Sequence, residues 1–449
     1  MAVLTADLAV DRATSTSSHP VRLLQVFAVT VMVLPADYVV KAIGADGYAA
    51  ALVAYMMFLA WVAATLFGLH DPRQFHYPVR MALGGLWVVT LASYVLMNRG
   101  LLSTIQLAAA DRWLMQLAAT SGVVLVAAEW LYSLDDVRRV IRTLTWAGAF
   151  CGIVAVLQFK AKTDLTKYLK LPGFSTNGIA AVNAVIGSRS GQSRVPGTAT
   201  DPIELGVVAA MLLPLAAYLL MHDKERPKLQ RWLPFMGIAL AIPASVSRSA
   251  IIGVVVALGV LIVSLPPVRR LKGLSAVPPA VGVVFVAAHG LLGTLKSFFL
   301  AGTGDSSIAH RVNNYPYVLQ LVHQSPWVGQ GGGTYIPLSA LNILDNEYLT
   351  KVIELGILGV IALLFWLFWP PIAALVARAR TTDPEIRDLC AALAGAGFAG
   401  AICSVTFDSF SFPMFASIQA LIAGLTGTVW IIVHREAQAR LQTRSGGGS

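Results

Sequence analysis

The chain has 449 residues, of which 56% are hydrophobic and 12% are charged, and its formal net charge is +10. Soluble domains carry about twice that charged fraction, so the composition excludes an ordinary soluble globular protein. Apolar runs of about twenty residues recur along the chain, which is the length a helix needs to cross a bilayer. Because lipid offers the backbone no hydrogen-bonding partner, we predict an all-α polytopic membrane protein.

The apolar runs predict about twelve transmembrane helices. Their approximate limits are 22–42, 47–69, 79–98, 112–132, 138–159, 203–222, 231–246, 249–266, 275–298, 347–370, 388–406 and 413–433. Arginine and lysine gather in every second connection, which places both termini in the cytoplasm by the positive-inside rule. Residues 1–20 lack the basic start, apolar core and cleavage site of a signal peptide, so we expect the first span to direct insertion.

This topology predicts five parts. They are a cytoplasmic tail (1–21), a membrane domain of about nine spans (22–298), an outer loop region (299–346), the last three spans (347–433) and a cytoplasmic tail (434–449) whose end, 445–449, resembles an artificial linker. The outer loop 160–202 is basic, which is unexpected for that side. It either binds anionic lipid headgroups, is too long to follow the rule, or attracts an anionic substrate.

The outer region 299–346 carries the longest polar interruption in the second half of the chain. Apolar residues recur there at three- and four-residue spacing: Ile308, Val312, Tyr315, Leu319 and Val322. The spacing predicts an amphipathic helix that lies flat on the membrane or on other helices, with Arg311 on its other side. A Pro-Trp turn and a glycine run follow at 326–333, which we interpret as a flexible loop beside a site.

Three arginines are predicted near the outer face, namely Arg194, Arg248 and Arg311. A guanidinium at membrane depth is costly unless it is paired, solvated or bound to a ligand. Its planar fork binds phosphate, so three of them around one cavity could hold a pyrophosphate without a metal. The alternative is a snorkelling residue at Arg248 and solvated loop charges at the other two positions.

Polar residues also stand where the tenth span begins. Asp345 or Glu347 could take a proton from a sugar hydroxyl, and the alternative is a helix N-cap at Asp345 or Asn346. We expect Asp408 to be a turn residue. His310, beside Arg311, is the histidine placed nearest this site.

Several classes of site have no signal in the sequence. The three cysteines, Cys151, Cys390 and Cys403, lie in apolar runs and are predicted to be core residues. There is no nucleotide-binding phosphate loop, which disfavours an ATP-driven pump, and no His/Cys/Asp spacing typical of a metal site. We therefore expect no metal and no cofactor.

The ordered motifs between about 190 and 370 resemble one family. They are Arg-x-x-Gly ending in Asp-Pro (194–202), Ser-x-Ser-Arg (245–248), an outer helix with Arg311, His-x-Ser-Pro-x-x-Gly-x-Gly (323–331), x-Asn-x-Tyr-Leu (345–349) and Glu-Leu-Gly-Ile-Leu-Gly (354–359). Together they resemble the O-antigen ligase and polymerase family of bacterial membrane glycosyltransferases.

The resemblance implies a donor glycan on undecaprenyl pyrophosphate and a glycan or lipid acceptor. The acceptor hydroxyl attacks the anomeric carbon with inversion and without a metal, and the arginines neutralise the leaving pyrophosphate. Asn346, Tyr348 and His310 are then substrate-binding candidates. The expected location is the bacterial inner membrane, with the active site on the outer face. The expected partners are membrane lipids and other envelope-polysaccharide assembly proteins, and no nucleic acid.

One departure affects the assignment within the family. Ligases typically carry His-Asn where this chain has Asp345-Asn346, which favours a polymerase of lipid-linked repeat units over a ligase. A transporter of an anionic lipid or solute is the alternative from another class, and it predicts spans broken by glycine or proline, for which Pro243 and Pro278-Pro279 are weak candidates. A non-catalytic scaffold would tolerate replacement of the arginines.

Overall fold

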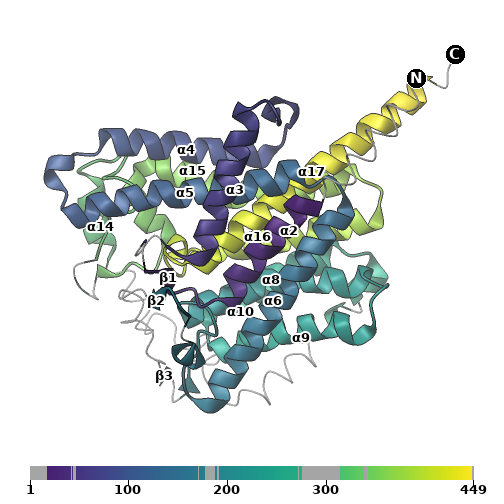
Figure 1. Cartoon of the computed structure of the whole chain (residues 1–449), viewed down its shortest axis with the longest axis horizontal. Coiled ribbons are helices and arrows are strands. Elements are labelled where there is room, and N and C mark those ends of the chain that lie inside the picture. The colour runs from purple at the N-terminus through teal and green to yellow at the C-terminus, as the bar shows by residue number, and fades with distance from the viewer. Residues whose placement is uncertain are drawn as a thin grey trace.

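The computed structural model describes residues 18–41, 43, 47–169, 171–176, 188–189, 192–271, 273–275, 314–337, 339 and 342–446. The long helices in these residues are α2 (Ser18–Val33), α3 (Ala49–Leu66), α4 (Pro78–Leu96), α5 (Thr104–Trp130), α6 (Leu134–Ala161), α8 (Pro202–His222), α9 (Lys228–Ser245), α10 (Arg248–Ser264), α15 (Glu347–Arg380), α16 (Pro384–Cys403) and α17 (Pro413–Gly446). They pack into one bundle, in which α4, α5 and α15 run together while α17 extends beyond the other helices (Figure 1).

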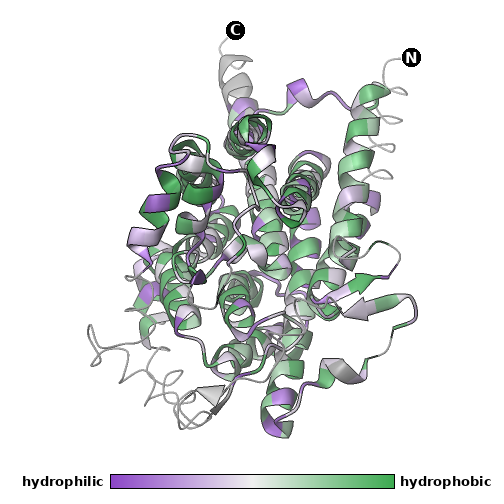
Figure 2. Ribbon diagram, turned by 90° about the vertical axis from the view of Figure 1, so that its left-hand side faces the viewer, coloured by the Kyte–Doolittle hydropathy of each residue, from purple (hydrophilic) through white to green (hydrophobic). Residues whose placement is uncertain are grey.

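The helices confirm a multi-pass membrane protein. Within the described residues, eight are long and apolar enough to cross a bilayer, and α2 and α10 are shorter apolar helices. Figure 2 shows hydrophobic residues along most of their length. The ninth predicted span, 275–298, lies outside the described residues apart from Ser275, so the number twelve stays a prediction.

The first predicted span, 22–42, is longer than the helix that forms. α2 ends at Val33, because Pro35 lacks an N–H and disfavours helical geometry in the residue before it. Residues Tyr38–Val40 instead form β1, antiparallel to β2 (Phe174–Thr176), with Val39 opposite Ser175. The connection after α2 is therefore joined to the loop 160–202.

Short elements complete the connections. They are β3 (Ser188–Arg189), which pairs with β4 (Gln192–Ser193), the 3-10 turns η2 (Pro72–Gln74), η3 (Arg99–Leu101), η4 (Leu165–Tyr168) and η7 (Ser409–Ser411), and the helix α14 (Tyr315–Val322).

Helix starts follow local sequence signals. Asp201 precedes Pro202 and accepts a hydrogen bond from the Ile203 N–H at 2.6 Å, so an aspartate N-cap and a proline in the first turn start α8. The same pair starts α16, where Asp383 accepts from the Glu385 N–H at 2.7 Å. These caps fix the points at which the chain enters the bundle.

The helix ends sort onto two faces. On one face, Arg142 binds Asp223 at 2.9 Å, and Asp388 contacts both His222 and Arg269. These contacts join the N-terminal parts of α6 and α16 to the end of α8 and the segment after α10. We call this side the basic face. The opposite side, with the first turns of α8, α10 and α15 and the α16–α17 connection, is the motif face.

The bundle core is apolar and closely packed. Cys151, Cys390 and Cys403 are buried, as predicted. Small residues let α6 and α9 approach: a Cβ on Gly152 would lie 2.1 Å from the carbonyl oxygen of Gly237.

Candidate functional site

The start of α15 is the first part of the candidate site, and Asn346 caps it. The Asn346 side chain accepts hydrogen bonds from the N–H groups of Tyr348 at 3.0 Å and Leu349 at 3.3 Å. The N-cap alternative is therefore correct for Asn346. Asp345, which precedes the cap, is half-buried and has φ 48°, in the left-handed region that aspartate tolerates better than most residues.

Glu347 lies in a buried charged cluster. Its Oε1 is 3.4 Å from Lys351 Nζ, which contacts Glu354 Oε2 at 2.5 Å, and all three side chains are buried. Lys351 Nζ also lies 3.7 Å from the ring centre of Trp113 on α5, a cation–π contact. Two carboxylates and one ammonium in low dielectric hold the first two turns of α15 in a fixed geometry.

The α16–α17 connection forms hydrogen bonds with the start of α15. The Phe410 N–H donates to Glu347 Oε2 at 2.9 Å. Asp408 accepts from the Asn346 N–H at 3.2 Å and from Thr350 Oγ1 at 2.6 Å. Asp408 precedes the turn η7, as expected, and in addition orients the segment that contains Asp345.

Arg248 is the first residue of α10, and the helix start that carries it contacts the same connection. Its neighbour Ser249 accepts a hydrogen bond from Thr406 Oγ1 at 2.7 Å, and the Ser249 carbonyl accepts from Cys403 Sγ at 3.2 Å. Val246, two residues before Arg248, has φ 47°. A β-branched residue is rare in that region, and such backbone geometry persists where the surroundings enforce it, often at functional sites.

Arg194 lies in the segment that leads into α8 on the motif face. Gly197 is anchored there by Gln158, whose Oε1 accepts from the Gly197 N–H at 2.8 Å, and Val195 is buried. Two nitrogens of the Arg194 guanidinium, Nε and Nη2, are buried and make no hydrogen bond in the described structure. Buried unsatisfied donors on a permanent cation are suited to an anionic ligand.

α15 is broken nine residues after its start. Gly356 has φ 68° and ψ −167°, a conformation that is accessible essentially to glycine alone. The loop 326–331 supplies the hydrogen bonds that the break removes. The N–H groups of Gln330 and Gly331 donate to the carbonyls of Ile353 and Glu354 at 3.0 and 2.9 Å. In return, the N–H groups of Ile357 and Leu358 donate to the carbonyls of Pro326 and Trp327 at 2.9 and 3.2 Å.

The glycine run is therefore not a flexible loop, which corrects our interpretation of 326–333. A Cβ on Gly329 would lie 2.3 Å from the backbone of Glu354, and one on Gly332 would lie 2.2 Å from the Trp113 ring. The glycines allow the loop backbone to fill the break in α15 and to pack against α5.

The amphipathic helix is seen only in part, as α14. Tyr315 and Leu319 of the predicted apolar stripe are exposed, whereas Val318 is buried against Leu344 and Ile353. Val322, also in the predicted stripe, packs against the same cluster, so the packed side of α14 coincides with the predicted stripe only in part. Arg311 and His310 lie outside the described residues. Beside α14, burial raises the pKa of Tyr335, whose hydroxyl donates to the Asn342 carbonyl.

The structure brings several predicted residues to one face. Arg194, Arg248, Asp345, Asn346, Glu347 and Tyr348 all belong to segments of the motif face. Tyr348 donates to the Ala401 carbonyl at 2.8 Å, so it also anchors α15 to α16. Sequence reasoning missed Lys351, although its spacing of four from Glu347 and three from Glu354 is the signal for helical ion pairs. Trp113 had no signal, because its contact with Lys351 joins distant segments.

A comparison with known families matches the part of the chain that contains several of these residues. Residues 233–364 match the family model described as O-antigen ligase, and the segment contains Arg248, the start of α15 and its break. Arg194 and Asp408 lie outside the match. No curated protein matches the chain. The match over residues 233–364 therefore supports the O-antigen ligase and polymerase family of membrane enzymes for this chain.

Proposed function

We propose that this protein polymerises undecaprenyl-pyrophosphate-linked oligosaccharide repeat units of a surface polysaccharide. The observation that carries the proposal is the O-antigen ligase match, whose segment contains Arg248, Asp345 and Glu347 on one face. The α16–α17 connection ties the helix starts that carry them together, through Thr406 to Ser249 and through Phe410 to Glu347.

The proposed reaction is a direct displacement. An acceptor sugar hydroxyl attacks the anomeric carbon of the donor, the bond from that carbon to the pyrophosphate oxygen breaks, and the configuration inverts. The hydroxyl proton passes to a carboxylate, and lipid pyrophosphate leaves. Arg194, Arg248 and Arg311 stabilise the charge that develops on the leaving group. The N-terminus of α10, which begins at Arg248, also favours a negative charge there. On this scheme the reaction needs no metal.

Asp345 is the proposed base, and Glu347 the residue that positions it. Glu347 is 1% exposed and already engaged by Lys351 and the Phe410 N–H. Asp345 is half-buried, so an acceptor hydroxyl has access to it. Asn346 caps the start of α15 next to Asp345, and Tyr348 ties that start to α16. We assign His310, with Arg311, to substrate binding.

Transfer of the glycan to a lipid, protein or cell-wall acceptor is the alternative within the family, and the O-antigen ligase description supports it. The aspartate at position 345, where ligases carry histidine, favours polymerisation.

The broken helix α15 is the feature that a transporter would predict, but it argues for a fixed scaffold here. The carbonyls of Ile353 and Glu354 and the N–H groups of Ile357 and Leu358 all have backbone partners in the loop 326–331. A transporter that uses a broken helix coordinates its ion or substrate with such groups. In this protein they are occupied by the chain itself.

We place the protein in the bacterial inner membrane, with the basic face in the cytoplasm and the motif face outside, where other envelope-polysaccharide assembly proteins would act with it. The positive-inside rule supports this orientation.

The proposal is tested by replacing Arg248. In a strain that depends on this protein for its polysaccharide, Arg248→Ala should abolish long polymer at normal protein level, because the leaving group loses a cationic partner. The matched control is Arg99→Ala, since Arg99 lies on the motif face but stacks on Tyr94, outside the motifs. Equal polymer in the Arg248→Ala strain and the wild type would overturn the proposal.

A further inference from the structure

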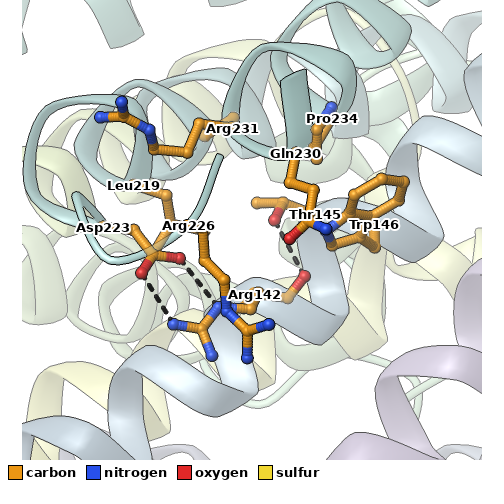
Figure 3. Close-up of a pocket in the computed structure, with 10 residues that line it drawn as sticks. Arg142, Thr145, Trp146, Leu219, Asp223, Arg226, Gln230, Arg231 and Pro234 are labelled. Carbon is orange, nitrogen blue, oxygen red and sulfur yellow. Dashed lines mark hydrogen bonds and ion pairs between the residues drawn. The ribbon is translucent and has the colours of Figure 1, made fainter. Parts of the chain in front are cut away.

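A second site lies on the basic face, away from the motif face. A pocket of about 310 Å³ opens between α6, α8 and the start of α9 (Figure 3). The residues that line it are Arg142, Thr145, Trp146, Ala216, Leu219, Asp223, Arg226, Gln230, Arg231 and Pro234.

The pocket has an excess of positive charge. Three arginines line it, and Asp223 is the single carboxylate among its lining residues. Asp223 is already bound by Arg142, through Nε and Nη2, both at 2.9 Å. Figure 3 shows Arg226 pointing toward the guanidinium of Arg142, so two like charges converge on one end of the pocket. An anion bound there would relieve their repulsion and take the planar donors that Asp223 leaves open.

The start of α9 supplies further donors. The Nε of Arg231 is buried and makes no hydrogen bond among the described residues, while Nη1 donates to the Leu220 carbonyl at 3.2 Å. α9 begins at Lys228 after Pro227, which offers no side-chain cap. The uncapped helix start and the buried guanidinium nitrogen both favour an anionic group at this end.

The rim of the pocket indicates the source of that anion. Trp146 lines the pocket and begins an exposed apolar stripe on α6 with Phe150 and Ile153. On α9, Leu229 and Leu233 are exposed beside the lining residues Gln230 and Pro234. Apolar surfaces of this kind at the end of a membrane span face acyl chains. A ligand that has both a phosphate and acyl chains would satisfy the pocket and its rim at the same time.

We propose that this pocket binds the phosphate of an anionic membrane lipid, whose acyl chains lie along α6 and α9. Arg142 and Arg226 contact the phosphate, and the start of α9 borders the site. Basic pockets between helices at a membrane boundary bind acidic headgroups in this way. The site is separate from the proposed chemistry and does not depend on it.

The test uses the purified, delipidated full chain in detergent. Native mass spectrometry compares binding of phosphatidylglycerol and phosphatidylcholine, with inorganic phosphate as competitor. We expect a preference for phosphatidylglycerol that Arg226→Gln weakens about fivefold, the effect of one interfacial arginine. Arg226 is exposed, so the variant should fold. The matched control is Arg73→Gln, an exposed arginine of η2 on the same face, which should leave the preference unchanged.

Three results would overturn the proposal. Equal binding of both lipids would mean that the pocket does not recognise the headgroup. Displacement of phosphatidylglycerol by inorganic phosphate would assign the pocket to a free anion. If Arg226→Gln and Arg73→Gln weakened phosphatidylglycerol binding equally, the preference would come from the general surface charge and not from the pocket.

Discussion

At the residue scale, Lys351 makes the start of α15 sensitive to single substitutions. It is buried between Glu347 and Glu354 and stacks on Trp113. Removing one member of a buried ion cluster leaves an uncompensated buried charge. Removing both members of a pair removes the desolvation cost together with the electrostatic attraction. The cluster thus couples the stability of the bundle to the position of Asp345.

We predict that Lys351→Met lowers the unfolding free energy by about 3 kcal/mol. The double variant Lys351→Met/Glu354→Gln should recover part of this loss, because fewer carboxylates remain unpaired. Thermal unfolding in detergent measures both, and Arg440→Met, which removes a half-exposed ion pair with Glu436, should stay within about 0.5 kcal/mol of the wild type. Equal losses in the single and double variants would show that the charges are not coupled.

Which residues of the site could be predicted depends on how local their contacts are. Asn346 as a cap and the buried cysteines were predictable, because a cap uses residues two and three positions away and burial follows from apolar runs. The contacts that hold Glu347 and Asn346 were not predictable, since they are made by Phe410 and Asp408, sixty or so positions away. The position of Arg311 stays a prediction.

At the element scale, α15 and the loop 326–331 act as one unit. The helix breaks at Gly356, and the loop restores four backbone hydrogen bonds that the hydrocarbon could not supply. The sequence shows glycines at 329, 331, 332, 333 and 356 but not that they meet. Hydropathy likewise predicts an unbroken span there, because a single glycine changes the apolar run very little.

We predict that Gly356→Ala destabilises the protein by several kcal/mol. Alanine is strained at φ 68° and ψ −167°, and its Cβ would lie 2.3 Å from the backbone of Trp327. The measurement is the midpoint of thermal unfolding in detergent. Gly84→Ala is the control, because a Cβ there meets nothing within 4 Å and alanine favours the interior of α4. A Gly356→Ala protein as stable as the control would contradict this description of the break.

At the scale of the whole molecule, the two faces carry different chemistry. The basic face holds ion pairs and the arginine-lined pocket, and the motif face holds the helix starts that carry Arg248 and Asn346 within the matched segment. The apolar runs and the loop charges predicted this division, because successive connections between spans lie on opposite sides of the bundle. The short α2 was mispredicted, since the apolar residues after Pro35 form β1 in place of a helix.

The orientation is tested with single cysteines. Leu101→Cys on the motif face and Glu225→Cys on the basic face both lie at exposed positions, and the native cysteines are buried. In spheroplasts, a membrane-impermeant maleimide should label Leu101→Cys at once and Glu225→Cys only after lysis. The reverse order would mean that the motif face is cytoplasmic.

The most direct test of the central claim is polymerisation by the purified protein. Undecaprenyl-pyrophosphate-linked repeat units are incubated with the wild type or with Asp345→Asn in detergent with a chelator, and lipid-linked glycans are resolved by gel. We predict a ladder of longer glycans for the wild type and unextended donor for Asp345→Asn. Unextended donor with the folded wild-type protein would contradict the proposed polymerase, and an unchanged ladder with Asp345→Asn would contradict its proposed base.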